Sequence, residues 1–218
     1  HDHSLQIKKG RMIVSDAGCE NPQGYCSDIT RSVPVGGKFS SRQKDIYEAV
    51  LAAQTLVPSL IAPGVKYSDI HIAAVSRLAS ALKELGLMKG NLQDAVAQGA
   101  MGMFMPHGLG HMMGLDVHDM ENYGENYVGY DKKNVRSTQF GLASLRLGRE
   151  LQEGFVLTNE PGCYFIPELI DKWRAEGKCK DYIDYDKVEQ YKDFGGIRIE
   201  DDLLVTKNGC RLLGKYIP

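Results

Sequence analysis

Four short segments of this 218-residue chain concentrate carboxylate and imidazole side chains. The first contains Asp16 and Asp28, which we expect on two arms of a hairpin, because a turn-forming sequence at 21–24 separates strand-like runs at 12–17 and 27–35. Facing positions on antiparallel strands bring two carboxylates within about 5 Å, where a cation removes their repulsion. Two solvated aspartates at strand ends are the alternative, which this pair alone does not exclude.

The second segment is rich in histidine. His107 and His111 enclose the sequence GLG, and His118 follows seven residues later, so three of the six histidines lie within twelve residues. Glycines between two imidazoles allow the backbone to approach a ligand or metal closely. A polar loop with hydrogen-bonded histidines is the alternative interpretation.

The third and fourth segments place acidic residues at or near strands. Glu160 follows the apolar run FVLT at 155–158 after one intervening residue, Asn159, and Pro161 then ends the strand pairing. Arg198 and Glu200 are two apart in a predicted strand over 197–205, so they share one face of it. Solvated charges at strand ends explain each segment equally well when it is taken alone.

The four segments together describe one donor set. Asp16, Asp28, Glu160 and Glu200 offer hard oxygen donors, and one histidine adds an imidazole. Such a set suits Mn²⁺, Co²⁺ or Zn²⁺ without thiolate ligands. Two metal ions a few Å apart activate a water and stabilise the oxyanion of a tetrahedral intermediate, so the set predicts a two-metal hydrolytic site.

The elements that must position these donors are helices packed on a sheet. Ser40 and Gln43 form a capping-box sequence before a helix that extends to about residue 57, and Ser68 is a candidate N-cap for a second helix that Gly86 ends. Shorter helices are predicted at 91–100 and 167–177. The tract 120–144 is a polar connection without an assigned role. Long excursions between strands favour an α+β class with helices covering one curved sheet.

Composition excludes several classes of function. The net charge is −2, with 26 basic and 28 acidic residues, so no basic excess favours nucleic-acid binding. No apolar run approaches the roughly 20 residues that a membrane-spanning helix needs. The five cysteines are odd in number and contain no C-x-x-C, which favours reduced thiols and a cytoplasmic location.

Several sequence strings resemble one family of enzymes. They are SDAG (15–18), CSDITRSVPVGGKF (26–39), FMPHGLGHMMGLDVHD (104–119), LTNEPGCYFI (157–166) and GGIRIEDDLLVT (195–206). In this order they resemble the pita-bread metallopeptidases, and among these the proline-specific branch of prolidase and Xaa-Pro aminopeptidase more than methionine aminopeptidase. The resemblance covers essentially the whole chain. It implies the creatinase/aminopeptidase fold: a curved, mostly antiparallel sheet covered by helices, in two pseudo-twofold halves.

The resemblance also implies a role for each chemical residue. The implied metal ligands are Asp16, Asp28, His111, Glu160 and Glu200. Of these, Asp28 and Glu200 would bridge two ions, most often Mn²⁺, and Glu160 would also move a proton. His107 and His118 match the histidines on the substrate side, and Arg198 matches an arginine that orients the site carboxylates.

The implied function is an exopeptidase that cleaves between an N-terminal residue and a following proline. That bond is a tertiary amide without an N–H, so peptidases that bind the substrate as a strand lose a donor there. Aminopeptidase and dipeptidase activity both remain open. A catalytically inactive peptide- or protein-binding module is the alternative function, and a metal-free hydrolase of the creatinase type is a third. The complete donor set argues against both.

The resemblance also shapes the expected organisation. Residues 1–218 would form one catalytic domain without the family's N-terminal domain. The start HDHS has neither an initiator Met nor an apolar leader, so we expect the C-terminal portion of a longer protein. A homodimer is expected, with the missing N-terminal region as a further partner. The spacing from Asp16 to Asp28 is one residue wider than the family pattern, which predicts a bulged or longer hairpin.

Overall fold

The computed structural model describes residues 6–217, so the start HDHS at 1–4 lies outside the described residues. The strands are β1 (Met12–Ala17), β2 (Ile29–Pro34), β3 (Val156–Asn159), β4 (Gly162–Phe165), β5 (Gly195–Arg198), β6 (Asp201–Thr206) and β7 (Gly209–Leu212). The α-helices are α1 (Ser41–Leu56), α2 (Tyr67–Glu84), α3 (Leu92–Ala97), α4 (Glu125–Val128), α5 (Pro167–Ala175) and α6 (Tyr185–Val188). Short 3₁₀ turns cover Val57–Ser59, Ala100–Met103, Glu121–Tyr123, Leu142–Ser144 and Glu189–Tyr191.

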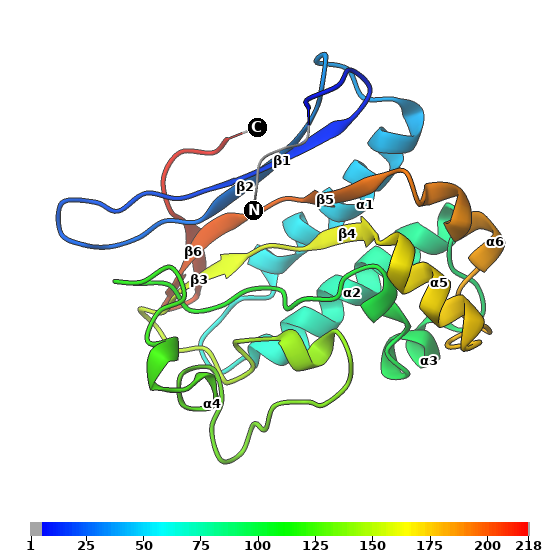
Figure 1. The fold of residues 1–218 in the computed structure, drawn as a ribbon. Coiled ribbons are helices and arrows are strands. Elements are labelled where there is room, and N and C mark those ends of the chain that lie inside the picture. Colours follow the sequence, from blue (N-terminus) through cyan, green and yellow to red (C-terminus); the bar gives the residue numbers. More distant parts are fainter. Residues whose placement is uncertain (1–5, 218) are drawn as a thin grey trace.

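The strands pair in antiparallel sets that follow one curved surface (Figure 1). β1 pairs with β2, β4 with β5, and β6 lies between β3 and β7. Contacts of β5 with β1 and β2, and of β2 with β6, join the sets. This arrangement agrees with the predicted curved, antiparallel sheet.

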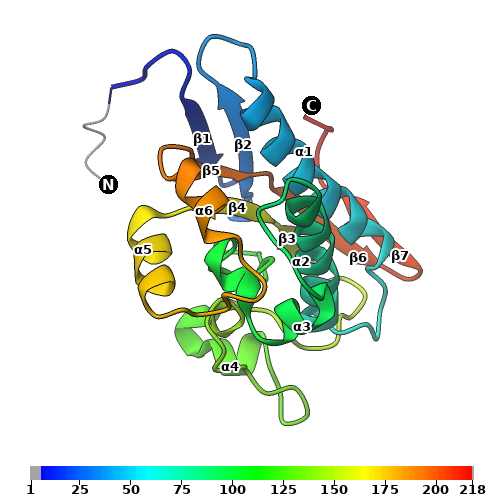
Figure 2. The same ribbon diagram turned by 90° about the vertical axis from the view of Figure 1, so that its right-hand side faces the viewer.

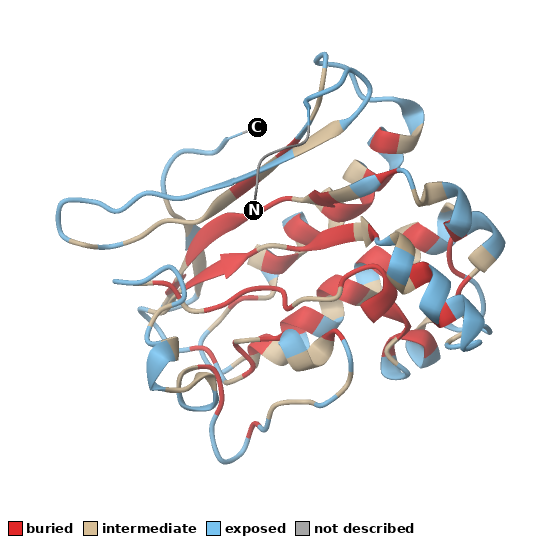
Figure 3. Ribbon diagram, viewed as in Figure 1, coloured by how far each residue is buried: buried red, intermediate tan, exposed pale blue. Residues whose placement is uncertain are grey.

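Helices α1 and α2 lie side by side along one face of this surface, as Figures 1 and 2 show. The Ser40 hydroxyl accepts from the Gln43 N–H while the Gln43 side chain accepts from the Ser40 N–H, which confirms the predicted capping box. Burial follows the helix faces that contact the strands (Figure 3). Large buried side chains such as Phe165, Ile46 and Leu78 belong to one continuous core, which fixes the strand ends that carry the donors.

The predicted strand at 197–205 is divided in two. β5 ends at Arg198 because it pairs with β4, and β6 begins at Asp201 because it pairs with β3. The two residues between them make the transition from one strand pair to the next. Glu200 therefore lies at a break in the strand rather than within it.

The second helix begins earlier than its capping sequence predicts. Lys66, not Ser68, is the N-cap, and its side chain makes no capping hydrogen bond. The Tyr67 N–H instead donates to the Arg149 carbonyl, and the Tyr67 hydroxyl donates to the Thr158 carbonyl at 2.6 Å. Tertiary contacts thus fix this helix start more strongly than the local cap.

Two further observations concern membrane-spanning helices and cysteines. Within residues 6–217 no helix is both long and apolar enough to cross a membrane. The five cysteines, all in this described part, are free thiols.

Candidate metal centre

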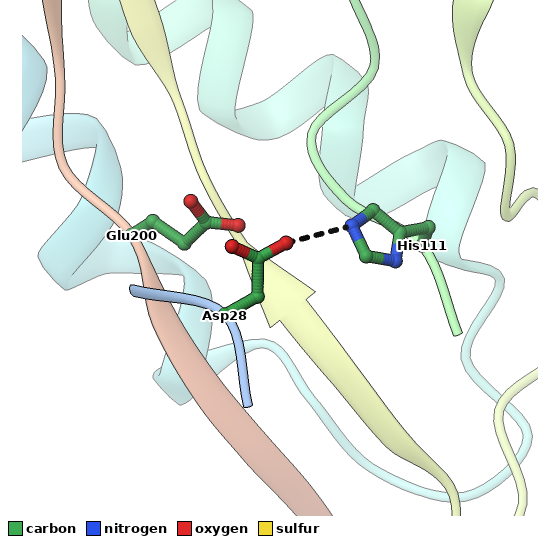
Figure 4. A group of neighbouring side chains, drawn as sticks. All are labelled: Asp28, His111 and Glu200. Atoms are coloured by element: carbon green, nitrogen blue, oxygen red, sulfur yellow. Dashed lines mark ion pairs between the residues drawn. The ribbon is translucent and has the colours of Figure 1, made fainter. Parts of the chain in front are cut away.

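Three of the predicted donors converge directly. Asp28 precedes β2, His111 lies in the extended segment beside β3, and Glu200 lies between β5 and β6 (Figure 4). One donor atom from each of them lies within 4.8 Å of the others. His111 and Glu200 are each 2% exposed, so this cluster is closed to bulk water on most sides.

Glu160 extends the cluster from the end of β3. Its Oε1 lies 3.7 Å from His111 Nε2, and Asp28 Oδ2 lies 3.5 Å from the same nitrogen. The Thr158 hydroxyl accepts from the His111 N–H at 3.1 Å and donates to Glu160 Oε1 at 3.3 Å. Glu160 therefore lies beside the three converging donors, on the side of His111.

The His111 ring is oriented as a metal ligand. Its Nδ1 lies 2.9 Å from the Met112 carbonyl, which can only accept, so Nδ1 carries the proton. Nε2 then faces Asp28 and Glu160. Histidines that bind metals regularly donate their other N–H to a backbone carbonyl in this way.

The glycines between the two histidines allow a close approach, but to a strand rather than to a ligand. A Cβ on Gly110 would lie 2.1 Å from the Thr158 carbonyl oxygen, so only glycine fits there. The close contact lets the Thr158 N–H donate to the His111 carbonyl and the His111 N–H donate to the Thr158 hydroxyl. The backbone approaches closely as the pattern predicts, and Gly110 contacts β3.

Asp16 lies at the border of the cluster. In the hairpin register Asp16 faces Thr30, so Asp16 and Asp28 are diagonal neighbours, not the facing pair we expected. The register continues to a bridge between Glu20 and Cys26, so the extra residue lengthens the hairpin without a bulge. The Asp16 carboxylate forms an ion pair with Arg198.

The charges of the site are incompletely balanced by the protein itself. Burial raises the pKa of Glu160 from 4.5 to about 7, and the Asp28 carboxylate adds to this rise. Burial and the neighbouring carboxylates of Glu160 and Asp28 raise the pKa of Glu200 to about 8. The pKa of Asp28 is lowered despite its burial, because it interacts with His111 and Asp16. The residues present therefore fit a bound divalent cation, which would replace protons at the two glutamates.

A chain of hydrogen bonds connects His107, Tyr164 and Arg198. His107 Nδ1 lies 2.7 Å from the Gly108 carbonyl, so Nδ1 carries the proton and Nε2 accepts from the Tyr164 hydroxyl at 3.0 Å. The guanidinium of Arg198 donates to the same hydroxyl at 3.2 Å. Burial lowers the pKa of His107 to about 4, so its imidazole is neutral at pH 7.

His118 lines a cavity together with the other two predicted histidines. A cavity of about 120 Å³ is lined by His107, His111, His118, Ser144, Arg146 and Glu160, together with Gly108 and Gly110. The rings of His111 and His118 meet edge to face, with their centroids 4.3 Å apart. The structure thus brings all three predicted histidines to one cavity with Glu160.

Sequence reasoning missed three polar residues that support the site. Thr30 donates to Glu200 Oε2 at 2.6 Å, Asp202 accepts from the Asp28 N–H at 3.1 Å, and Tyr164 links His107 to Arg198. Thr30 and Asp202 each lie two residues beyond a predicted ligand. Because residues two apart in a strand share one face, this spacing could have indicated them. Nothing in the spacing of Tyr164 distinguished it.

The raised glutamate pKa values predict a pH-dependent response to metal. At Glu160 and Glu200 the metal-free folded chain binds protons more tightly than the unfolded chain. The stability that these two protons contribute is therefore full below about pH 4.5 and lost as the pH rises through 7 and 8. We expect Mn²⁺ to raise Tm more at pH 8 than at pH 6, because cations replace these protons. Thermal melts at constant ionic strength measure this, and Glu200→Gln should reduce the difference. An equal rise at both pH values would contradict the charge assignment.

The fold and the donor set together define an α+β domain built around a metal centre. The sequence profile of metallopeptidase family M24 matches residues 1–207. The chain belongs to metallopeptidase family M24. Its fold is accordingly the pita-bread fold that the sequence strings implied.

Individual relatives agree with this membership. The chain is 41% identical to the human Xaa-Pro dipeptidase over 95% of its own length and 40% of the relative's. It is 36% identical to a probable Xaa-Pro aminopeptidase of Talaromyces marneffei, with 95% and 42% coverage. A zinc-substituted Escherichia coli aminopeptidase P solved with product superposes with a TM-score of 0.73 at 35% identity, over 97% of this chain and 40% of that one. The chain thus spans about 40% of the length of these relatives.

Proposed function

We propose that this chain carries the catalytic centre of a metal-dependent exopeptidase that hydrolyses the bond between an N-terminal residue and a following proline. The observation that supports it most is the convergence of Asp28, His111, Glu160 and Glu200 beside a cavity that His107 and His118 also line. The names of the relatives, Xaa-Pro dipeptidase and Xaa-Pro aminopeptidase, agree in bond specificity.

The proposed ligands are Asp16, Asp28, His111, Glu160 and Glu200, with Asp28 and Glu200 bridging two ions. Asp16 would exchange part of its ion pair with Arg198 for a metal contact. When bound, the metal ions supply Lewis-acid polarisation of the scissile carbonyl and lower the pKa of water. Mn²⁺ is the proposed native ion, with Co²⁺ and Zn²⁺ as alternatives that the same donors accept.

The chain's own residues would then handle the proton and the substrate. Glu160, which lines the cavity beside the proposed ions, would take a proton from the attacking water and return it to the proline nitrogen. Neutral His107 and His118 contact the substrate from the cavity. Arg198 and Tyr164 keep His107 in one tautomer.

Three further parts of the proposal rest on the resemblance and on composition. Peptides with proline at the second position are the proposed substrates. A homodimer is the proposed assembly, with an N-terminal region as a further partner. The free thiols agree with a reducing, cytoplasmic setting.

Metal analysis combined with a matched pair of peptides tests the proposal. The purified chain is equilibrated with Mn²⁺, its metal content is measured, and hydrolysis of Ala-Pro is compared with that of Ala-Pro-Ala. Cleavage of both peptides indicates an aminopeptidase, and cleavage of Ala-Pro alone indicates a dipeptidase. Metal binding with peptide binding but no cleavage would favour the inactive binding module instead.

A further inference from the structure

The tract at 120–144, which the sequence left without a role, contains α4 and lies at the lower left of Figure 1. It begins at Met120, one of two non-glycine residues with positive φ among those described (φ 57°). A side chain in this left-handed region strains the backbone, and such strain often marks a functional position. Here it turns the chain so that Glu121 faces His118, three residues earlier.

A continuous chain of ion pairs crosses this tract. Arg136 pairs with Glu125, and Arg136 Nε donates to the Ala143 carbonyl at 2.7 Å. Arg146 Nη1 donates to Glu125 Oε1 at 2.7 Å and to Glu121 Oε2 at 2.5 Å. Two arginines therefore hold two glutamates, and the last carboxylate of the chain is that of Glu121.

Glu121 connects this chain of ion pairs to the cleft. Its Oε2, the oxygen that accepts from Arg146, lies 3.7 Å from His118 Nδ1. The Glu121 side chain is 14% exposed, whereas that of His118 is 46% exposed. The Glu121 carboxylate is thus fixed by Arg146, and the more exposed His118 ring lies next to it.

We propose that Glu121 is a positioning residue for His118, and that Arg146, Glu125 and Arg136 hold it in place. A carboxylate beside Nδ1 favours the tautomer with the proton on Nδ1 and turns Nε2 toward the cavity. The inference rests on the proposed function, because it assumes that His118 contacts substrate. It gives the tract at 120–144 a role in shaping that contact.

Two substitutions separate positioning from general stability. Glu121→Ala removes the carboxylate, and Arg136→Ala removes the far end of the ion-pair chain without touching the cavity. Glu153→Ala, in an exposed turn, is the control. Each chain is loaded with Zn²⁺ and studied at one pH by long-range ¹H–¹⁵N NMR of the His118 ring, assigned by comparison with His118→Gln. Rates on Ala-Pro and zinc content are measured in parallel.

Glu121→Ala is expected to move the His118 ring from the Nδ1–H tautomer and to lower kcat by about 10- to 100-fold, with KM changed less than about twofold and full zinc content. Arg136→Ala should shift the same signals less, and Glu153→Ala not at all. Unchanged His118 signals in Glu121→Ala, or in Arg136→Ala if the first variant does not fold, would overturn the inference. If the unmodified chain cleaves no Xaa-Pro peptide, the proposed function fails, whereas the NMR signals still decide whether Glu121 positions His118.

Discussion

Glu200→Gln is expected to slow Xaa-Pro hydrolysis by at least about 10³-fold and to lower the metal content of the chain. Glu200 is 2% exposed, lies with Asp28 and His111 around one point, and is held there by Thr30. Glutamine keeps the size but replaces an anionic donor by a neutral amide. Metal ions contribute several kcal/mol of charge stabilisation in the transition state, and each 1.36 kcal/mol corresponds to a factor of ten. Elemental analysis and initial rates in one manganese buffer measure both effects.

The neighbouring Asp201→Asn is the matched control. Asp201 points away from the cluster, where it accepts from Arg31 at 2.7 Å and from Gln54 at 2.5 Å. We expect normal metal content and a rate within about threefold of the unmodified chain. The free energy of unfolding should fall by about 1–3 kcal/mol, because the charge opposite Arg31 is lost. Equal losses of activity in the two variants would show that Glu200 is not a ligand.

Local sequence patterns predicted the parts of the fold that local interactions determine. The strand run at 12–17, the turn after it and the capping box at Ser40 depend on neighbours within a few residues, and the structure has all three. Glu160 lies directly after its strand, as Pro161 indicated. The antiparallel sheet and the family also followed from the short sequence strings. Most of these strings contain a strand or its end together with a carboxylate or imidazole side chain.

Features that depend on distant partners were beyond the sequence. The break before Asp201 arises because the flanking strands pair with different neighbours. Tyr164 belongs to the site because its hydroxyl contacts His107 and Arg198, which are 57 and 34 residues away in the chain. Glu121 beside His118 also pairs with Arg146, which is 25 residues away. Such contacts are set by packing of the whole sheet, which periodicity and spacing do not report.

His111→Ala is expected to lower the metal content of the chain, while His107→Ala leaves it near normal and lowers turnover by about 10² or more. The two residues are four apart but differ in their surroundings. His111 Nε2 faces the carboxylates of Asp28 and Glu160, whereas His107 Nε2 accepts from the Tyr164 hydroxyl and the His107 side chain lines the cavity. A ligand sets how much metal is bound, and a substrate-side group acts on the transition state.

Elemental analysis and initial rates on an Xaa-Pro peptide in one metal buffer separate these roles. Added metal should restore part of the activity of His111→Ala, because weakened binding is overcome at higher concentration. The same addition should do nothing for His107→Ala, whose metal is already bound. Loss of metal from His107→Ala and its retention by His111→Ala would reverse the assignment. The Nδ1 contact of His111 with the Met112 carbonyl would then serve the fold alone.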